Sequence, residues 1–123
     1  MAKEPATIMI VEDNFITAKY FSELLYHAGH RVCGCANTAD EAVEMAIMHD
    51  PDAILMDVRL GGRSDGVEAG HRIASHVDVP IIYITGSQEP ETMLRIRETH
   101  PSAILIKPIM PEQLLSALDS VLA

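Results

Sequence analysis

The chain is poor in cysteine and has no long apolar run. Its two cysteines, Cys33 and Cys35, lie one residue apart in an expected strand, where a disulfide would be strained and further metal ligands are lacking. We expect both to be small buried side chains on one face of that strand, in a reducing compartment. No apolar run approaches the ~20 residues of a membrane helix, and residues 1–5 lack the apolar core of a signal peptide. We therefore expect a cytoplasmic chain with no membrane partner.

Basic residues are also scarce. Nine Lys and Arg residues stand against eighteen Asp and Glu residues, which gives a formal net charge of −9 at pH 7. Nucleic acids are bound through clustered basic side chains, and those of this chain are scattered, so we expect no nucleic-acid partner. Tryptophan is absent, yet 48% of the 123 residues are hydrophobic, as in a soluble globular protein. We expect a single domain over residues 1–123.

The stretch at residues 53–57 organises the rest of the sequence. Four apolar residues lead to Asp57, and a pair of glycines, Gly61 and Gly62, follows shortly after. Such a run predicts a strand of a parallel sheet that is buried on both faces. An acid at its end lies at the carboxyl edge of the sheet, where open α/β sheets build their sites. We therefore expect Asp57 to be the centre of the functional site.

Four further strands are predicted, and helical patterns alternate with all five. Strict alternation of strands and helices implies a parallel sheet with helices on both faces. We predict an α/β fold, a flavodoxin-like doubly wound (βα)5 unit with strand order 2-1-3-4-5. The predicted strands are residues 7–11, 31–36, 53–57, 80–85 and 102–106.

The first helix has clear start and stop signals. Asn14 has the chemistry of an N-cap, and Gly29 is suited to end the helix. Apolar residues recur at three- and four-residue spacing along this helix, and we expect them to form its buried face. They are Ile16, Tyr20, Phe21, Leu24, Leu25 and Ala28.

Polar side chains follow four of the predicted strands. Glu12 and Asp13 follow the first strand, Asp57 ends the third, Thr85 ends the fourth, and Lys107 follows the fifth. Parallel strands bring these residues to one edge, where three carboxylates would repel one another unless a cation neutralises them. Oxygen ligands with room for water and a phosphoryl oxygen suit Mg²⁺. The sequence therefore predicts a magnesium site beside Asp57.

This set of residue types predicts phosphoryl chemistry. The Asp57 carboxylate is a nucleophile that can accept a phosphoryl group and form an aspartyl phosphate. Mg²⁺ would offset charge on the moving group, while the Lys107 ammonium and the Thr85 hydroxyl hold its oxygens in the product.

The chain resembles the receiver domain of two-component response regulators, of the single-domain, CheY-like kind. The resemblance extends over essentially the whole chain, and five short motifs carry it in the right order. These are Glu12-Asp13, Met56-Asp57, Asp65-Gly66, Thr85-Gly86 and Lys107-Pro108.

The resemblance implies a partner and a set of roles. It implies that a sensor histidine kinase, or a histidine phosphotransfer protein, phosphorylates Asp57, and that the chain assists its own phosphorylation and dephosphorylation without being an enzyme. It implies Mg²⁺ held by Asp13, Asp57 and the backbone carbonyl of Arg59, with Glu12 helping through water. It also implies a cis peptide bond at Lys107-Pro108. Helix 1 and the Lys107-Pro108 loop are the expected kinase surface.

Two features depart from the family pattern. Many receivers carry Tyr or Phe three residues before the lysine as a switch, and this chain has Ile104 there. We expect the loop from Gly86 to Glu89, which includes Ser87, and the helix after it to rearrange instead. Tyr83 is an alternative ring, though core packing is its ordinary role. The loop that begins at Arg59 is also one residue longer than in compact receivers. The resemblance assigns the tuning of phosphoryl hydrolysis to Arg59 and Ser87.

Several alternatives compete with this interpretation. A phosphatase with an aspartyl phosphate intermediate needs a second acid two residues after the nucleophile, and that residue is Arg59. In a flavin carrier, Glu12-Asp13 would repel the cofactor phosphate. A degenerate receiver that acts as a phosphorylation-independent binding module stays open. Nothing follows Ala123, so we expect output through protein contact at helix 4, strand 5 and helix 5, or a phosphate sink. The expected state is a monomer or a phosphorylation-dependent dimer, and the downstream protein target is unknown.

Overall fold

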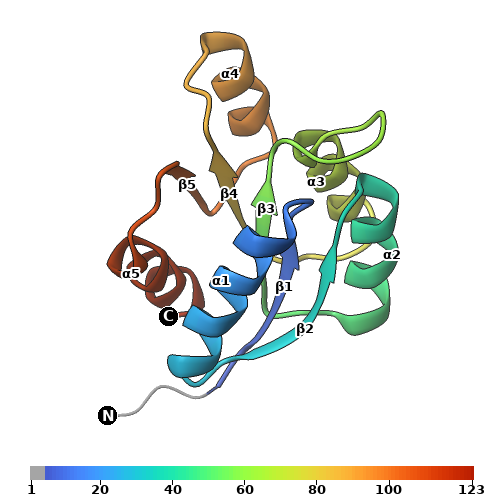
Figure 1. Ribbon diagram of the computed structural model, residues 1–123. Coiled ribbons are helices and arrows are strands. Elements are labelled where there is room, and N and C mark those ends of the chain that lie inside the picture. The colour runs from blue at the N-terminus through green and yellow to red at the C-terminus, as the bar shows by residue number, and fades with distance from the viewer. Residues whose placement is uncertain (1–4) are drawn as a thin grey trace.

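The structure, a computed structural model that describes residues 5–123, is built on a five-stranded parallel sheet (Figure 1). The strand order is β2-β1-β3-β4-β5, so the predicted fold and topology are confirmed. The expectation about a signal peptide concerns a segment that lies largely outside the described residues. The strands are β1 (Thr7–Val11), β2 (Arg31–Ala36), β3 (Ala53–Asp57), β4 (Ile81–Thr85) and β5 (Ala103–Ile106).

Five helices connect and follow these strands. Asn14, Thr38 and Asp65 each cap a helix by accepting a hydrogen bond from a backbone N–H three residues later. Gly29 follows the first helix with a φ of 90°, a conformation that glycine adopts without strain. Within the described residues, no helix is long and apolar enough to cross a bilayer. The helices are α1 (Phe15–His27), α2 (Ala39–His49), α3 (Gly66–Ala74), α4 (Pro90–Glu98) and α5 (Pro111–Leu122).

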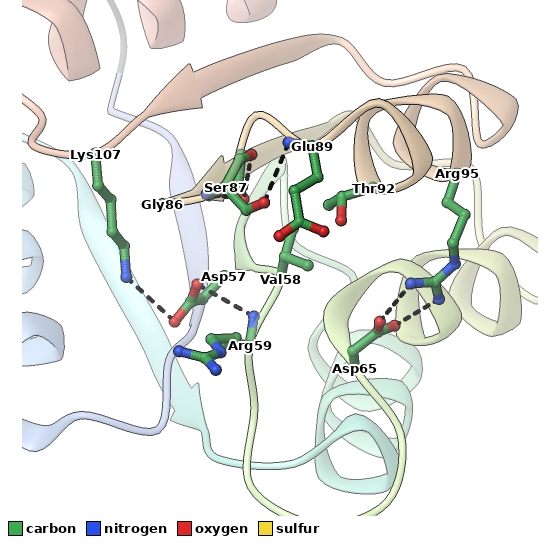
Figure 2. Close-up of a pocket in the computed structure, with 11 residues that line it drawn as sticks. Asp57, Val58, Arg59, Asp65, Gly86, Ser87, Glu89, Thr92, Arg95 and Lys107 are labelled. Carbon is green, nitrogen blue, oxygen red and sulfur yellow. Dashed lines mark hydrogen bonds and ion pairs between the residues drawn. The ribbon is translucent and has the colours of Figure 1, made fainter.

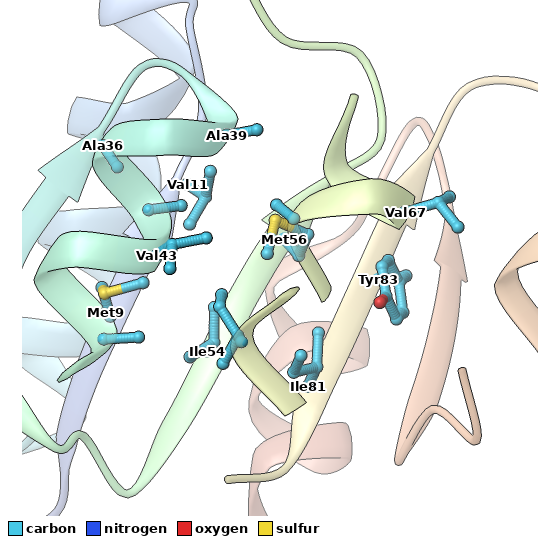
Figure 3. Packing of buried hydrophobic residues seen from close by; sticks show 14 of the residues in the cluster. Met9, Val11, Ala36, Ala39, Val43, Ile54, Met56, Val67, Ile81 and Tyr83 are labelled. Carbon is cyan, nitrogen blue, oxygen red and sulfur yellow. The ribbon is translucent and has the colours of Figure 1, made fainter. Parts of the chain in front are cut away.

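The sheet separates two apolar layers. On one face, side chains such as Met9, Ile54 and Tyr83 pack against α2 and α3 and against Ile96 of α4 (Figure 3). On the other face, the sheet packs against α1 and α5, with Leu114 of α5 fully buried. All residues of β3 and β4 are buried, as predicted for strands at the centre of a parallel sheet.

The register brings the carboxyl ends of the central strands together. Val11 of β1 pairs with Met56 of β3, and Asp57 pairs with Ile84 of β4. The backbone N–H of Lys107 donates to Thr85 O at 2.8 Å, so the residue after β5 lies beside the end of β4. The polar residues that follow these strands therefore converge on one edge.

The predicted buried face of α1 is partly wrong. Of the predicted residues, Phe21 and Leu25 are buried, whereas Ile16 is 77% exposed and Tyr20 is 43% exposed. Ala18, which was not predicted, is also buried. Apolar residues occur on more than one side of this helix, so spacing alone defines overlapping stripes. Docking on the sheet selects the stripe that carries Phe21.

The predicted arrangement of the cysteines is also wrong. A register shift pairs Ile8 with Val32 but Met9 with Gly34, so β2 contains an irregularity at Cys33. Cys33 is half-buried against the apolar layer of α2 and α3, whereas Cys35 is exposed with its Sγ 4.0 Å from Ser22 Oγ of α1. Because of the shift, the two thiols lie on opposite faces, and both are free.

Candidate functional site

Asp57 is the buried centre of the polar edge. It ends β3 and is 4% exposed, and the two oxygens of its carboxylate have different partners. Oδ2 lies 3.4 Å from Lys107 Nζ, and Oδ1 accepts a hydrogen bond from the backbone N–H of Arg59 at 3.4 Å (Figure 2). The ammonium group comes from the end of β5, two strands away in the sheet. The buried Asp57 carboxylate thus lies beside the ammonium group of Lys107, which is fifty residues later in the sequence.

Glu12 is a second buried carboxylate at this edge, with 2% exposure. Its Oε2 accepts a hydrogen bond from the backbone N–H of Asn14 at 3.1 Å, and its Oε1 lies 3.7 Å from Lys107 Nζ. Burial and, after it, the neighbouring Asp57 carboxylate raise the pKa of Glu12 to about 7, against the opposing effects of Asn14 and Lys107. One ammonium therefore serves two buried acids.

Three carboxylates form a cluster that fits a divalent metal ion. Glu12, Asp13 and Asp57 each offer an oxygen, and these oxygens lie within 4.8 Å of one another. Asp13 is exposed and opens the cluster to solvent, whereas Oε1 of Glu12 is buried and has no hydrogen-bond donor among the described residues. A buried oxygen without a donor, next to two further carboxylates, suits a hard cation such as Mg²⁺. These residues would hold it there.

Lys107 and Thr85 reach the edge from the last two strands. The Lys107-Pro108 peptide bond is cis, as the resemblance implied. Thr85 is 2% exposed, and its hydroxyl is engaged by its own loop: Oγ1 accepts from Ser87 N–H at 3.0 Å and donates to Ser87 O at 3.1 Å. In this structure the hydroxyl is thus bonded to Ser87.

A cavity of about 570 Å³ extends from Asp57 toward α4 (Figure 2). Among the predicted residues, Arg59, Thr85, Gly86, Ser87 and Lys107 line it. Glu12 and Asp13 are not among its lining residues. The cavity lies on the α4 side of Asp57. Asp57 thus belongs both to the cavity wall and to the cluster of three carboxylates, which share no other residue.

Three lining residues were not predicted as site residues, although they lie in the loop and helix that we expect to rearrange. Glu89, Thr92 and Arg95 come from α4 and the loop before it, and they lie on the side of the cavity away from Lys107 (Figure 2). Arg95 forms a two-pronged ion pair with Asp65, which also lines the cavity. Asp65 belongs to the Asp65-Gly66 motif, which the sequence analysis identified. No signal in the sequence, however, identifies an arginine of α4 as its partner.

An aromatic residue, Tyr83, lies beside Ile104 on the neighbouring strand. Ile104 is half-buried in β5 and pairs in register with Tyr83 of β4, which is completely buried. The phenol oxygen of Tyr83 fills the space beside Gly70 of α3, where a Cβ atom would collide with it. Tyr83 is therefore a core residue of the layer between the sheet and α3.

The fold and the acid edge together define a family. The chain matches the response regulator receiver domain over residues 8–119, which is most of its length. The protein belongs to this family of two-component response regulators.

Individual relatives show the same relationship. The chain is 33% identical over 118 residues to the transcriptional regulatory protein PdtaR of Mycobacterium tuberculosis, covering 96% of this chain but 57% of that protein. It is 31% identical over 121 residues to the polar-differentiation response regulator DivK of Brucella anthropi, covering 96% and 97%. The crystal structure of the receiver domain of a modulated diguanylate cyclase from Desulfovibrio desulfuricans matches with a TM-score of 0.90 and 34% identity, covering 97% and 94%. The chain thus spans little more than half of PdtaR and nearly all of DivK.

Proposed function

We propose that this protein is a phosphoacceptor in a two-component phosphorelay and that Asp57 takes the phosphoryl group. The observation that carries the proposal is the approach of Lys107 Nζ to Asp57 Oδ2, at 3.4 Å, beside two further carboxylates. A carboxylate next to one fixed ammonium and a Mg²⁺ site is equipped to carry a phosphoryl group as an acyl phosphate.

In the proposed transfer, a carboxylate oxygen of Asp57 attacks the phosphorus atom of a phosphohistidine. The new O–P bond forms as the N–P bond breaks, and the histidine nitrogen keeps the electron pair. Lys107 and Thr85 hold the phosphoryl oxygens, and for this the Thr85 hydroxyl leaves Ser87. Asp13, Asp57 and the backbone carbonyl of Arg59 would hold Mg²⁺, with Glu12 nearby, and the ion would supply positive charge that offsets the charge of the phosphoryl oxygens.

The chain assists both its own phosphorylation and its own dephosphorylation, since the group that reacts is its own Asp57. Hydrolysis returns the Asp57 carboxylate when water attacks the acyl phosphate and phosphate leaves. Arg59 and Ser87 line the cavity beside Asp57 (Figure 2). We propose that these two residues determine how readily water reaches the phosphoryl group on Asp57.

The proposed donor is a sensor histidine kinase or a histidine phosphotransfer protein. Phe15 and Ile16 begin α1 directly after the acid cluster, and they are 79% and 77% exposed. Apolar side chains exposed to this degree beside the reactive carboxylate suit the surface of a helical partner.

The proposed output of the chain is contact of α4, β5 and α5 with a protein target, or action as a phosphate sink. We also propose a cytoplasmic location and a state that is a monomer or a phosphorylation-dependent dimer.

A mass measurement tests the proposal. The protein is incubated with acetyl phosphate and Mg²⁺, and intact mass is compared with that of Asp57→Asn and of Asp78→Asn, which makes the same charge change away from the site. We expect one added phosphoryl group in the wild type and in Asp78→Asn, its loss with EDTA, and none in Asp57→Asn. An unchanged wild-type mass would overturn the proposal in favour of a phosphorylation-independent binding module.

A further inference from the structure

Asp65 is fixed to the strand that carries the phosphoacceptor. It is the N-cap of α3 and accepts a hydrogen bond from Glu68 N–H at 3.0 Å. The next residue, Gly66, donates its backbone N–H to Val58 O at 2.7 Å, and a Cβ atom at this position would collide with the Asp57 carbonyl. The carboxylate of Asp65 therefore keeps its position relative to Asp57.

Arg95, in contrast, is carried by a weakly anchored helix. Of the described residues of α4, Ile96 alone is fully buried, and the N-cap residue Glu89 provides no side-chain cap. Figure 1 shows α4 projecting beyond the tip of β4 at the carboxyl edge of the sheet. Elements with few buried contacts belong to the least stable part of a fold. α4 is thus the helix that can shift at low cost.

The Asp65–Arg95 ion pair joins these two parts across the cavity (Figure 2). Arg95 Nη1 lies 2.8 Å from Oδ2 and Nη2 lies 3.1 Å from Oδ1, so the guanidinium binds both carboxylate oxygens. Burial alone would raise the pKa of Asp65, but Arg95 and the Glu68 N–H lower it below its ordinary value. The pair is a defined contact between the β3–α3 junction and α4.

Thr85 connects the same helix to the phosphoacceptor. Its hydroxyl is bonded in both directions to Ser87, and α4 begins at Pro90, three residues further on. For the hydroxyl to reach a phosphoryl group on Asp57, these bonds must break and the loop before α4 must move. Arg95 would then be displaced from Asp65, which stays with β3. Tyr83 is completely buried against Gly70, so this movement belongs to α4 and not to a turning ring.

We propose that the Asp65–Arg95 ion pair is a latch that holds α4 in the position of the unphosphorylated chain and so opposes occupancy of the phosphoacceptor site. The inference rests on the proposed function of Asp57. Because a ligand that requires the released position binds in proportion to the population of that position, breaking the pair strengthens its binding. The latch sets the threshold of the response without touching the reacting atoms.

The test uses variants that remove the pair and keep the rest of the site. Arg95→Gln removes the guanidinium, and Asp65→Asn removes the charge while Asn still caps α3. Arg97→Gln is the matched control on the same helix, and Asp65→Asn combined with Arg95→Gln completes a double-mutant cycle. Each protein is titrated with beryllofluoride at fixed Mg²⁺, followed by the amide NMR signals of Gly86 and Ser87. Hydrogen exchange of the α4 amides is measured without ligand.

We expect half-saturation at a beryllofluoride concentration about fivefold lower in Arg95→Gln and in Asp65→Asn, the effect of one two-pronged exposed pair. The double variant should gain no more than either single variant, and Arg97→Gln should match the wild type. Exchange of α4 should accelerate in the three variants that lack the pair.

Failure of the latch and failure of the proposed function give different results. A wild type that takes up neither beryllofluoride nor a phosphoryl group removes the phosphoacceptor assignment itself. A wild type that binds, with both single variants unchanged or weakened in affinity, leaves the phosphoacceptor in place and overturns the latch. If Arg95→Gln is unfolded by circular dichroism, the affinity of Asp65→Asn decides alone.

Discussion

The phenol oxygen of Tyr83 occupies the place that a Cβ atom on Gly70 would need. The two residues belong to β4 and α3, so the helix backbone approaches the sheet closely at this point. Tyr83, a buried core residue, thus favours glycine at position 70 of α3.

Gly70→Ala should destabilise the protein by about 1–3 kcal/mol, because the added methyl group must displace a fully buried ring. Removing the oxygen in a Tyr83→Phe background should recover part of this loss. Urea unfolding of the two single variants and the double variant measures the coupling. Additive effects would show that the ring and the helix backbone do not compete for this space.

Glu12 should make stability fall between about pH 4.5 and pH 7 when Mg²⁺ is absent. Burial, with the Asp57 carboxylate, raises the pKa of Glu12 from an ordinary value of 4.5 to about 7 in the folded chain. The folded state therefore binds more protons than the unfolded state in this pH range. The contribution of Glu12 to the free energy of unfolding is lost as pH rises from 4.5 through about 7. The loss is on the order of 2–3 kcal/mol.

Denaturant unfolding in EDTA at pH 5 and pH 8 measures this effect as the difference between wild type and Glu12→Gln. Glu12→Gln should lack this part of the pH dependence, because its side chain does not titrate. The same slope in both proteins would assign the pH dependence to other groups.

Asp13→Asn should weaken Mg²⁺ binding by at least about tenfold, since the cluster loses one of its three carboxylate charges. Calorimetric titration with magnesium chloride gives the affinity directly. Asp78→Asn is the control, because it makes the same charge change before β4, at the opposite edge of the sheet. Equal affinities in the two variants would contradict a metal site at the acid cluster.

Leu25→Ala should cost about 2–5 kcal/mol of folding free energy, whereas Ile16→Ala should stay within about 0.5 kcal/mol of wild type. Leu25 is completely buried between α1 and the sheet, and Ile16 is largely exposed. Thermal and urea unfolding compare the two variants. A large loss for Ile16→Ala would show that this part of α1 is covered in solution.

Much of the fold could be predicted because its signals are local. Apolar runs such as residues 53–57 specify buried strands, and the alternation of strands with helices leaves few sheet orders. The ends of those strands then place Asp57 and Lys107 at a common edge without any knowledge of distances. The faces of α1 and the register of β2 were not predictable in this way, because each depends on how an element docks against its neighbours. Gly34, whose Cβ would collide with Met45 of α2, marks where docking changes the register.

By itself, the sequence determined the order of the elements and the residue types that meet at the carboxyl edge, since both follow from periodicity and from the geometry of parallel strands. Only the tertiary structure decided which oxygen of Asp57 faces Lys107, that the Thr85 hydroxyl is bonded to Ser87, and that Arg95 crosses the cavity to Asp65. These contacts join residues far apart in the chain or depend on one rotamer among several. They arise when the layers pack, and no local pattern encodes them.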